Sequence, residues 1–146
     1  MEREILFRGK RDPHYGKGWC YGVPYTDHEG DCIIATHNSQ MVVIEKTVGQ
    51  YTGLTDKNGV KIFEGDILKG FGYPFYSDGE FNYFAEVIWF DNSPAFGISL
   101  FKNSESNVRD VSDGLLYYLE DFNSDDYEVI GNVFDNPEQL KGESNA

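Results

Sequence analysis

Two turn signals lie close together in the stretch 47–68, and this stretch constrains the fold more than any other part of the chain. Asn58-Gly59 is the dipeptide that a tight chain reversal needs, because a type I′ or αL-containing turn requires positive φ and these residues tolerate it. Gly65-Asp66 follows as a second turn, directly before the next apolar strand. Two turns within about ten residues predict a small, tightly curled β-structure. Asn58, Gly59, Gly65 and Asp66 are therefore assigned a structural role.

The remainder of the chain also favours strands over helices. Aromatic residues make up 16% of the chain and Gly occurs 16 times. Aromatic side chains are enriched in strands, and glycine marks turns. The run 115–119 fits either a strand or a helical turn. Short apolar runs bounded by turn residues predict strands over 4–8, 19–23, 32–35, 41–44, 67–68, 84–90, 96–101 and 127–134.

Two local patterns refine this prediction. Trp19, Tyr21 and Val23 occupy alternate positions of one strand, so they share a face, as a half-buried strand requires. Asn136 before Pro137 is a pair typical of a helix N-cap and first turn. It predicts one short helix that ends at about residue 140.

The turn-rich stretch also carries a family resemblance. Residues 47–54 (TVGQYTGL), 56–59 (DKNG) and 62–67 (IFEGDI) resemble the signature of the YopX family of phage and prophage proteins. Residues 3–8 and 128–138 are similar to the opening strand and the closing segment of that family. The resemblance implies a compact β-fold with an SH3-like barrel component and a phage or prophage origin. It implies no catalytic residue.

We therefore expect a mainly β protein with a single YopX-like domain over 1–146. The SH3-like barrel would occupy about 44–134, additional N-terminal strands over 1–43 would extend it, and one short C-terminal helix would follow. The length agrees with this expectation, because 146 residues suit one domain with one core.

Charge is distributed unevenly along the chain, whose formal net charge is −13. Residues 1–70 hold nine Lys/Arg and ten Asp/Glu, whereas residues 71–146 hold three and fifteen. The negative second half would repel a duplex phosphate backbone, so nucleic-acid binding is not favoured. Two alternatives stay open: acidic mimicry of nucleic acid by the second half, and a nucleic-acid-associated barrel. The second would use the basic N-terminal residues Arg3, Arg8, Lys10, Arg11 and Lys17.

Metal binding and nucleophilic catalysis have little support in the sequence. Cys20, His28, Cys32 and His37 form the one candidate metal set, but they lack the close Cys pair of structural zinc sites. Cysteines in strands of such a protein act more often as small buried apolar residues. No Gly-x-Ser-x-Gly elbow is present, and neither Cys begins a helix. We expect no enzyme, no cofactor and no metal.

A cluster of aromatic residues follows the turns at Asn58-Gly59 and Gly65-Asp66. It includes Phe71, Tyr73, Phe75 and Tyr76, and no Lys or Arg lies between Lys69 and Lys102. Base-stacking surfaces place cations beside their aromatic rings, so this cluster fits a core or a protein contact better. Strand edges without Lys or Arg also invite pairing. We predict a homo-oligomer whose contact includes Phe71, Tyr73, Phe75 and Tyr76.

The function expected from the sequence is that of a phage or prophage accessory protein without catalytic activity. It would act through self-association or through contact with a host or phage protein. The chain starts without a signal-peptide pattern and contains no apolar run of membrane-spanning length. We therefore expect no membrane association and a location in the cytoplasm of the bacterial host cell.

Overall fold

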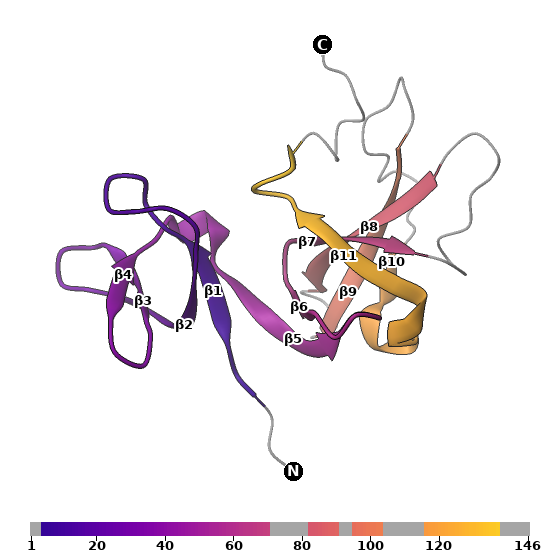
Figure 1. The fold of residues 1–146 in the computed structure, drawn as a ribbon, viewed down its shortest axis with the longest axis horizontal. Coiled ribbons are helices and arrows are strands. Elements are labelled where there is room, and N and C mark those ends of the chain that lie inside the picture. Colours follow the sequence, from indigo (N-terminus) through magenta and orange to yellow (C-terminus); the bar gives the residue numbers. More distant parts are fainter. Residues whose placement is uncertain (1–3, 71–81, 91–94, 104–115, 138–146) are drawn as a thin grey trace. The chain divides into compact units, whose positions relative to one another are not determined.

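The computed structural model describes residues 4–70, 82–90, 95–103 and 116–137 (Figure 1). The described residues are mainly β and contain three short 3₁₀-helices but no α-helix. The chain divides into two compact units, Met1–Gly53 and Leu54–Ala146. This division falls about ten residues after the boundary that we expected between the N-terminal strands and the barrel. A single domain over 1–146 stays a prediction.

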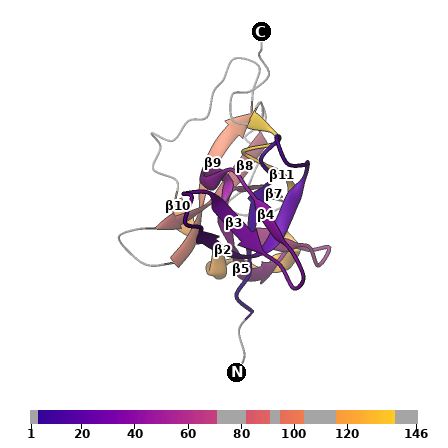
Figure 2. The same ribbon diagram turned by 90° about the vertical axis from the view of Figure 1, so that its left-hand side faces the viewer.

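The first unit is an antiparallel meander, seen from a second direction in Figure 2. Its sheet has the strand order β4-β3-β2-β1-β5, and β6 follows β5 at the end of that order. A 3₁₀-helix, η1 (Glu45–Thr47), connects β4 to β5. The strands of this sheet are β1 (Phe7–Lys10), β2 (Trp19–Thr26), β3 (Cys32–Ala35), β4 (Gln40–Val42), β5 (Gly49–Thr55) and β6 (Lys61–Phe63), of which β6 belongs to the second unit.

One face of this sheet forms the core of the first unit. Cys20, Ile34 and Val43 are buried there, surrounded by partly buried apolar residues of β1, β3, β4 and the segment before β5. Glycine makes room for them: a Cβ at Gly9 would lie 3.0 Å from Val43 Cγ2 and 3.3 Å from Ile34 Cγ1. The missing side chain at position 9 therefore lets β1 pack closely over this core without displacing Val43 or Ile34.

The second unit contains a five-stranded antiparallel sheet with the order β10-β9-β8-β7-β11. Its core consists of buried apolar residues from β6, β7, β8, β9, η2 and β11: Ile62, Leu68, Ala85, Val87, Ile98, Leu119 and Tyr127. The elements are β7 (Asp66–Gly70), β8 (Asn82–Phe90), β9 (Ala95–Asn103), β10 (Leu116–Tyr118), η2 (Leu119–Asp121), η3 (Ser124–Asp126) and β11 (Tyr127–Asn132).

The mainly β class is confirmed, but two finer expectations are not met by the described residues. Their sheets are open, with β10 and β11 at the ends of one strand order, and they form no closed barrel over 44–134. The strand β5 also pairs with β1 of the N-terminal meander, so the expected extension over 1–43 is not separate from it. The predicted C-terminal helix reaches residues 138–140, which lie outside the described residues.

Candidate functional site

The central strand β2 carries apolar side chains on the face that the core does not cover. Tyr21, Val23 and Tyr25 follow one another on this face and are 47%, 59% and 41% exposed. Antiparallel pairing with β1 and β3 adds residues on the same side. We call this surface the outer face and define it as Trp19, Tyr21, Val23 and Tyr25 of β2, Arg8 and Lys10 of β1, and the buried Ile33 and half-buried Ala35 of β3.

The opposite side of β2 explains why the large side chains point outward. Its core-facing positions are Cys20, Gly22 and Pro24, which are all small. A Cβ at Gly22 would collide with the Ala35 carbonyl oxygen and would lie 3.2 Å from Ile34 Cγ2. The sequence predicted a half-buried strand correctly, but the shared face of its aromatic residues is the exposed one.

One end of the outer face is basic. The Arg8 guanidinium carbon lies 4.6 Å from the centre of the Trp19 ring, which is a cation–π distance. Arg8 is only 7% exposed, so its guanidinium is buried together with its stem. Lys10 pairs with Trp19 across β1 and β2, and the exposed Lys17 precedes β2 by two residues. Three cations therefore lie at or beside the start of β2.

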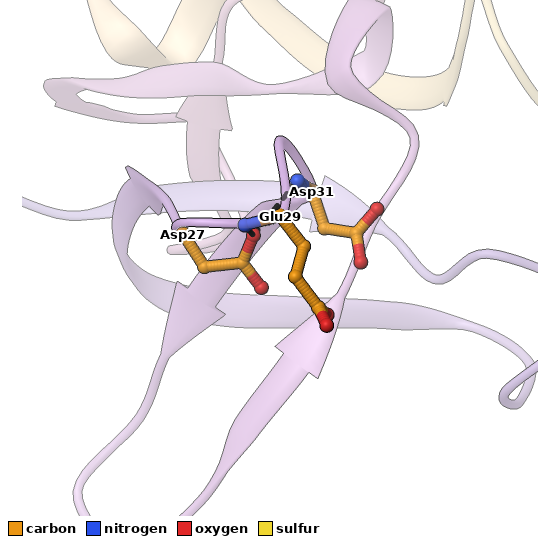
Figure 3. A group of neighbouring side chains, drawn as sticks. All are labelled: Asp27, Glu29 and Asp31. Carbon is orange, nitrogen blue, oxygen red and sulfur yellow. Dashed lines mark hydrogen bonds between the residues drawn. The ribbon is translucent and has the colours of Figure 1, made fainter.

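The other end is acidic. Figure 3 shows Asp27, Glu29 and Asp31 in the turn between β2 and β3, where one ligand oxygen of each lies within 4.8 Å of the others. Asp27 Oδ1 accepts hydrogen bonds from the amides of Glu29 and Asp31, both at 2.9 Å. This is the one group of three or more potential metal ligands found among residues 4–70, 82–90, 95–103 and 116–137.

The hairpin between β5 and β6 repeats this turn and shows what its aspartate does. Asp56 Oδ1 accepts from the amides of Asn58 at 2.8 Å and Val60 at 2.9 Å, as Asp27 does from the equivalent amides. Gly59 has a φ of 80° and Gly30 a φ of 89°. Asp27 therefore has a structural role, because its side chain closes the turn. The β5–β6 hairpin forms the same turn with an apolar residue, Val60, at the position of Asp31.

The turn at Asn58-Gly59 adopts the αL-containing geometry, one of the two that the sequence allowed. Gly59 has positive φ but Asn58 does not, so the turn contains one αL residue and is not of type I′. Asp66 is 2% exposed and its Oδ2 accepts from the amide of Phe63 at 2.8 Å. The Gly65 amide donates to the Val87 carbonyl, which ties the second turn to β8.

The four residues of the sequence-derived metal set are not brought together. Cys20 packs in the core of the first unit, with its Sγ 3.2 Å from Met41 Sδ, whereas His28 and His37 are exposed. Burial raises the pKa of the Cys20 thiol, although Arg11 opposes that effect. Burial, and then Glu45, raises the pKa of the half-buried Cys32. Both thiols are thus less ionised than an ordinary cysteine at neutral pH.

The remaining predicted site residues do not lie together in the structure. Of the five basic residues, Arg8 and Lys10 lie on the outer face, and Arg11 instead donates to the Tyr15 carbonyl at 3.1 Å. Arg3 lies outside the described residues, and so does the predicted contact of Phe71, Tyr73, Phe75 and Tyr76. In the described part of the chain, no helix has the length and apolar character to cross a membrane.

Comparisons with known proteins identify a family and a similar structure. The family model described as YopX protein matches residues 19–141. A solved structure, described as the crystal structure of protein EF1440 from Enterococcus faecalis, is 24% identical with a TM-score of 0.47. The match covers 96% of this chain and 100% of that chain. The search of curated proteins finds no match.

Proposed function

The chain belongs to the YopX family, and we propose that it acts without catalysis, by binding another macromolecule through the outer face. The observation that carries this proposal is the exposure of Tyr21, Val23 and Tyr25 on consecutive outward positions of a central strand. The solvent side of an antiparallel sheet is normally polar. Contiguous apolar residues with tyrosine among them are typical of a protein contact.

The described chemistry agrees better with binding than with catalysis. The raised pKa values of Cys20 and Cys32 disfavour the thiolate that a cysteine nucleophile needs. Asp27 of the acidic group is occupied by two amides of its own turn. The proposal also includes the accessory role, the phage or prophage origin and the location in the bacterial cytoplasm that we expected from the sequence.

Two further elements of the proposal rest on the sequence. The SH3-like description of about 44–134 follows from the family resemblance alone, and the described sheets are open. A second contact through Phe71, Tyr73, Phe75 and Tyr76 follows from the aromatic run without Lys or Arg. Both belong to the proposed accessory role.

Nucleic-acid binding is the second candidate, and one observation favours it. The stacked pair of Arg8 and Trp19, with Lys10 beside it, is a combination that single-strand binders use. Three carboxylates at the other end of β2 and the net charge of −13 oppose it. We predict negligible binding of duplex DNA at physiological salt, measured by fluorescence anisotropy. Tight binding that weakens steeply with added salt would contradict this prediction.

Site-specific photo-crosslinking in cells tests the proposed function. A benzophenone amino acid replaces Val23 on the outer face or, as the control, Val60 at the tip of the β5–β6 hairpin. These valines are 59% and 47% exposed, so both probes reach solvent. After irradiation in the bacterium that carries the gene, we expect an adduct from position 23 and none from position 60. No adduct at position 23, or equal adducts at both positions, would contradict the proposal.

A further inference from the structure

We propose that the partner of the outer face is a second copy of this chain, packed face to face with the two β2 strands antiparallel. This inference rests on the proposed function and names its partner. Its centre is Val23, the most exposed of the three apolar residues of β2. A two-fold axis beside Val23 and perpendicular to the strands places Tyr21 of each copy over Tyr25 of the other.

The side chains of β2 fit such a symmetric contact. Tyr21 and Tyr25 lie two residues on either side of Val23, and all three share one parity. A sheet packed on a sheet buries alternate residues of both partners in a layer about 10 Å thick. A two-fold contact requires one patch that is complementary to itself. This strand offers an aliphatic residue at the axis and an aromatic residue on each side.

Charge selects the antiparallel arrangement over the parallel one. Cations lie at the start of β2, at Lys10 and Lys17, whereas the turn after β2 carries Asp27, Glu29 and Asp31. In the antiparallel arrangement the basic end of each copy meets the acidic end of the other. A parallel arrangement would place cations on cations and carboxylates on carboxylates, which interfaces avoid.

One exposed charged residue at each end makes this pairing testable. Lys17 lies two residues before β2, and Glu29 lies in the turn after β2. In the antiparallel arrangement the end of β2 with Lys17 in one copy meets the end with Glu29 in the other. Since the axis generates this pair twice, a substitution at either position acts on both ends of the contact.

A second copy accounts for more of the outer face than a nucleic acid does. A single strand would use Arg8, Lys10 and Trp19, but its phosphates would meet three carboxylates beyond Tyr25. Self-association uses both ends and the apolar centre. It also closes after two copies, so the exposed face leads to a dimer and not to a fibre.

Sedimentation velocity on the purified full chain, over a concentration series, tests the proposal. Wild type should show a concentration-dependent dimer. Val23→Lys should raise the dissociation constant tenfold or more, because it places two lysines beside the axis. The matched control Val60→Lys introduces the same charge at an exposed valine of the β5–β6 hairpin, and it should leave the dimer unchanged. Circular dichroism verifies that each variant is folded.

A charge exchange supplies an independent measurement. Lys17→Glu and Glu29→Lys should each weaken the dimer about two- to fivefold, as an exposed ion pair allows, and the double variant should regain the wild-type affinity. Weakening by both single variants without recovery would overturn the antiparallel arrangement.

The outcomes separate this inference from the proposed function. A wild type that stays monomeric at high micromolar concentration, or a dimer unaffected by Val23→Lys, overturns the self-association. If the crosslinker at position 23 then captures another protein or a nucleic acid in cells, the proposed function stands with a different partner. If it captures nothing, both proposals fail. An adduct of twice the chain mass supports both.

Discussion

The repeated turn allows one stability prediction to be tested inside a single molecule. Asp27 and Asp56 hold equivalent positions in the β2–β3 and β5–β6 turns, and Oδ1 of each accepts from two backbone amides of its own turn. They differ in the second oxygen: Asp56 Oδ2 accepts from the amide of Val129 in β11 at 2.9 Å. Asp56 is also 3% exposed, whereas Asp27 is half-buried. The pair isolates the bond to β11.

Replacement by asparagine gives the sharpest contrast. The amide of asparagine keeps one oxygen that can accept the two turn bonds, so Asp27→Asn should change the free energy of unfolding by less than about 0.5 kcal/mol. In Asp56→Asn the side-chain NH₂ faces the Val129 amide, so two donors meet and a charge-assisted bond is lost. Such bonds contribute about 1.5–3 kcal/mol, and we expect a loss of about 2 kcal/mol.

Replacement by alanine removes the turn bonds as well. Loss of a capping side chain from exposed amides costs about 1 kcal/mol, which is the effect expected for Asp27→Ala. Asp56→Ala adds the loss of the bond to Val129, so its total should reach about 3 kcal/mol. The difference between the two aspartates should therefore be similar in the alanine and asparagine series.

The two tryptophans of the chain report separately on the two units. Trp19 lies in the first unit and Trp89 in the second. Urea unfolding followed by fluorescence in a Trp19→Phe background therefore measures the unit with Asp56, and a Trp89→Phe background measures the unit with Asp27. Equal losses for Asp27→Asn and Asp56→Asn at constant urea dependence would refute the assigned role of the Val129 bond.

Two further predictions use the same urea assay. A Cβ at Gly59 would have no heavy atom within 4 Å, so Gly59→Val should lower the free energy of unfolding by about 1–2 kcal/mol through backbone strain alone. Gly59→Asn should lower it clearly less, because asparagine tolerates positive φ, and equal losses for the two variants would contradict this. Burial, and then Asp126 and Asp56, raises the pKa of Tyr127. The folded state thus favours the neutral phenol. The stability that Tyr127 contributes is therefore complete below the ordinary tyrosine pKa of about 10 and is lost as the pH rises through the higher pKa of the folded state. Tyr127→Phe should flatten the fall in stability of the second unit above about pH 10, and an unchanged pH profile would contradict this assignment.

Local turn chemistry was the part of the fold that the sequence predicted best. Asn58-Gly59 lies at a hairpin and Gly65-Asp66 at a second turn, because glycine and aspartate favour these conformations within a few bonds of themselves. The turn at Asp27 shares the pattern Thr-Asp-x-x-Gly with the turn at Asp56. That repeat was visible in the sequence, but only the common hydrogen bonds show that it has a common cause.

Strand pairing was beyond the reach of local patterns. Phe7 pairs with Gln50, and Leu68 pairs with Val129, across more than 40 residues of sequence in each case. Such pairs form because the whole sheet buries its apolar side, and no residue near β1 or β7 specifies its partner. For this reason the mainly β class could be predicted, but the open sheets and the membership of β5 in the N-terminal meander could not.

The direction of the outer face could not be predicted for a related reason. A period of two shows that Trp19, Tyr21, Val23 and Tyr25 share a side of β2, but not which side the core takes. Hydrophobicity alone would turn this larger set inward. The structure turns inward the smaller set around Gly22, because β3 approaches too closely there for any side chain. The first unit still leaves Tyr21 47% exposed and Tyr25 41% exposed on this face, so folding buries only part of these two large side chains.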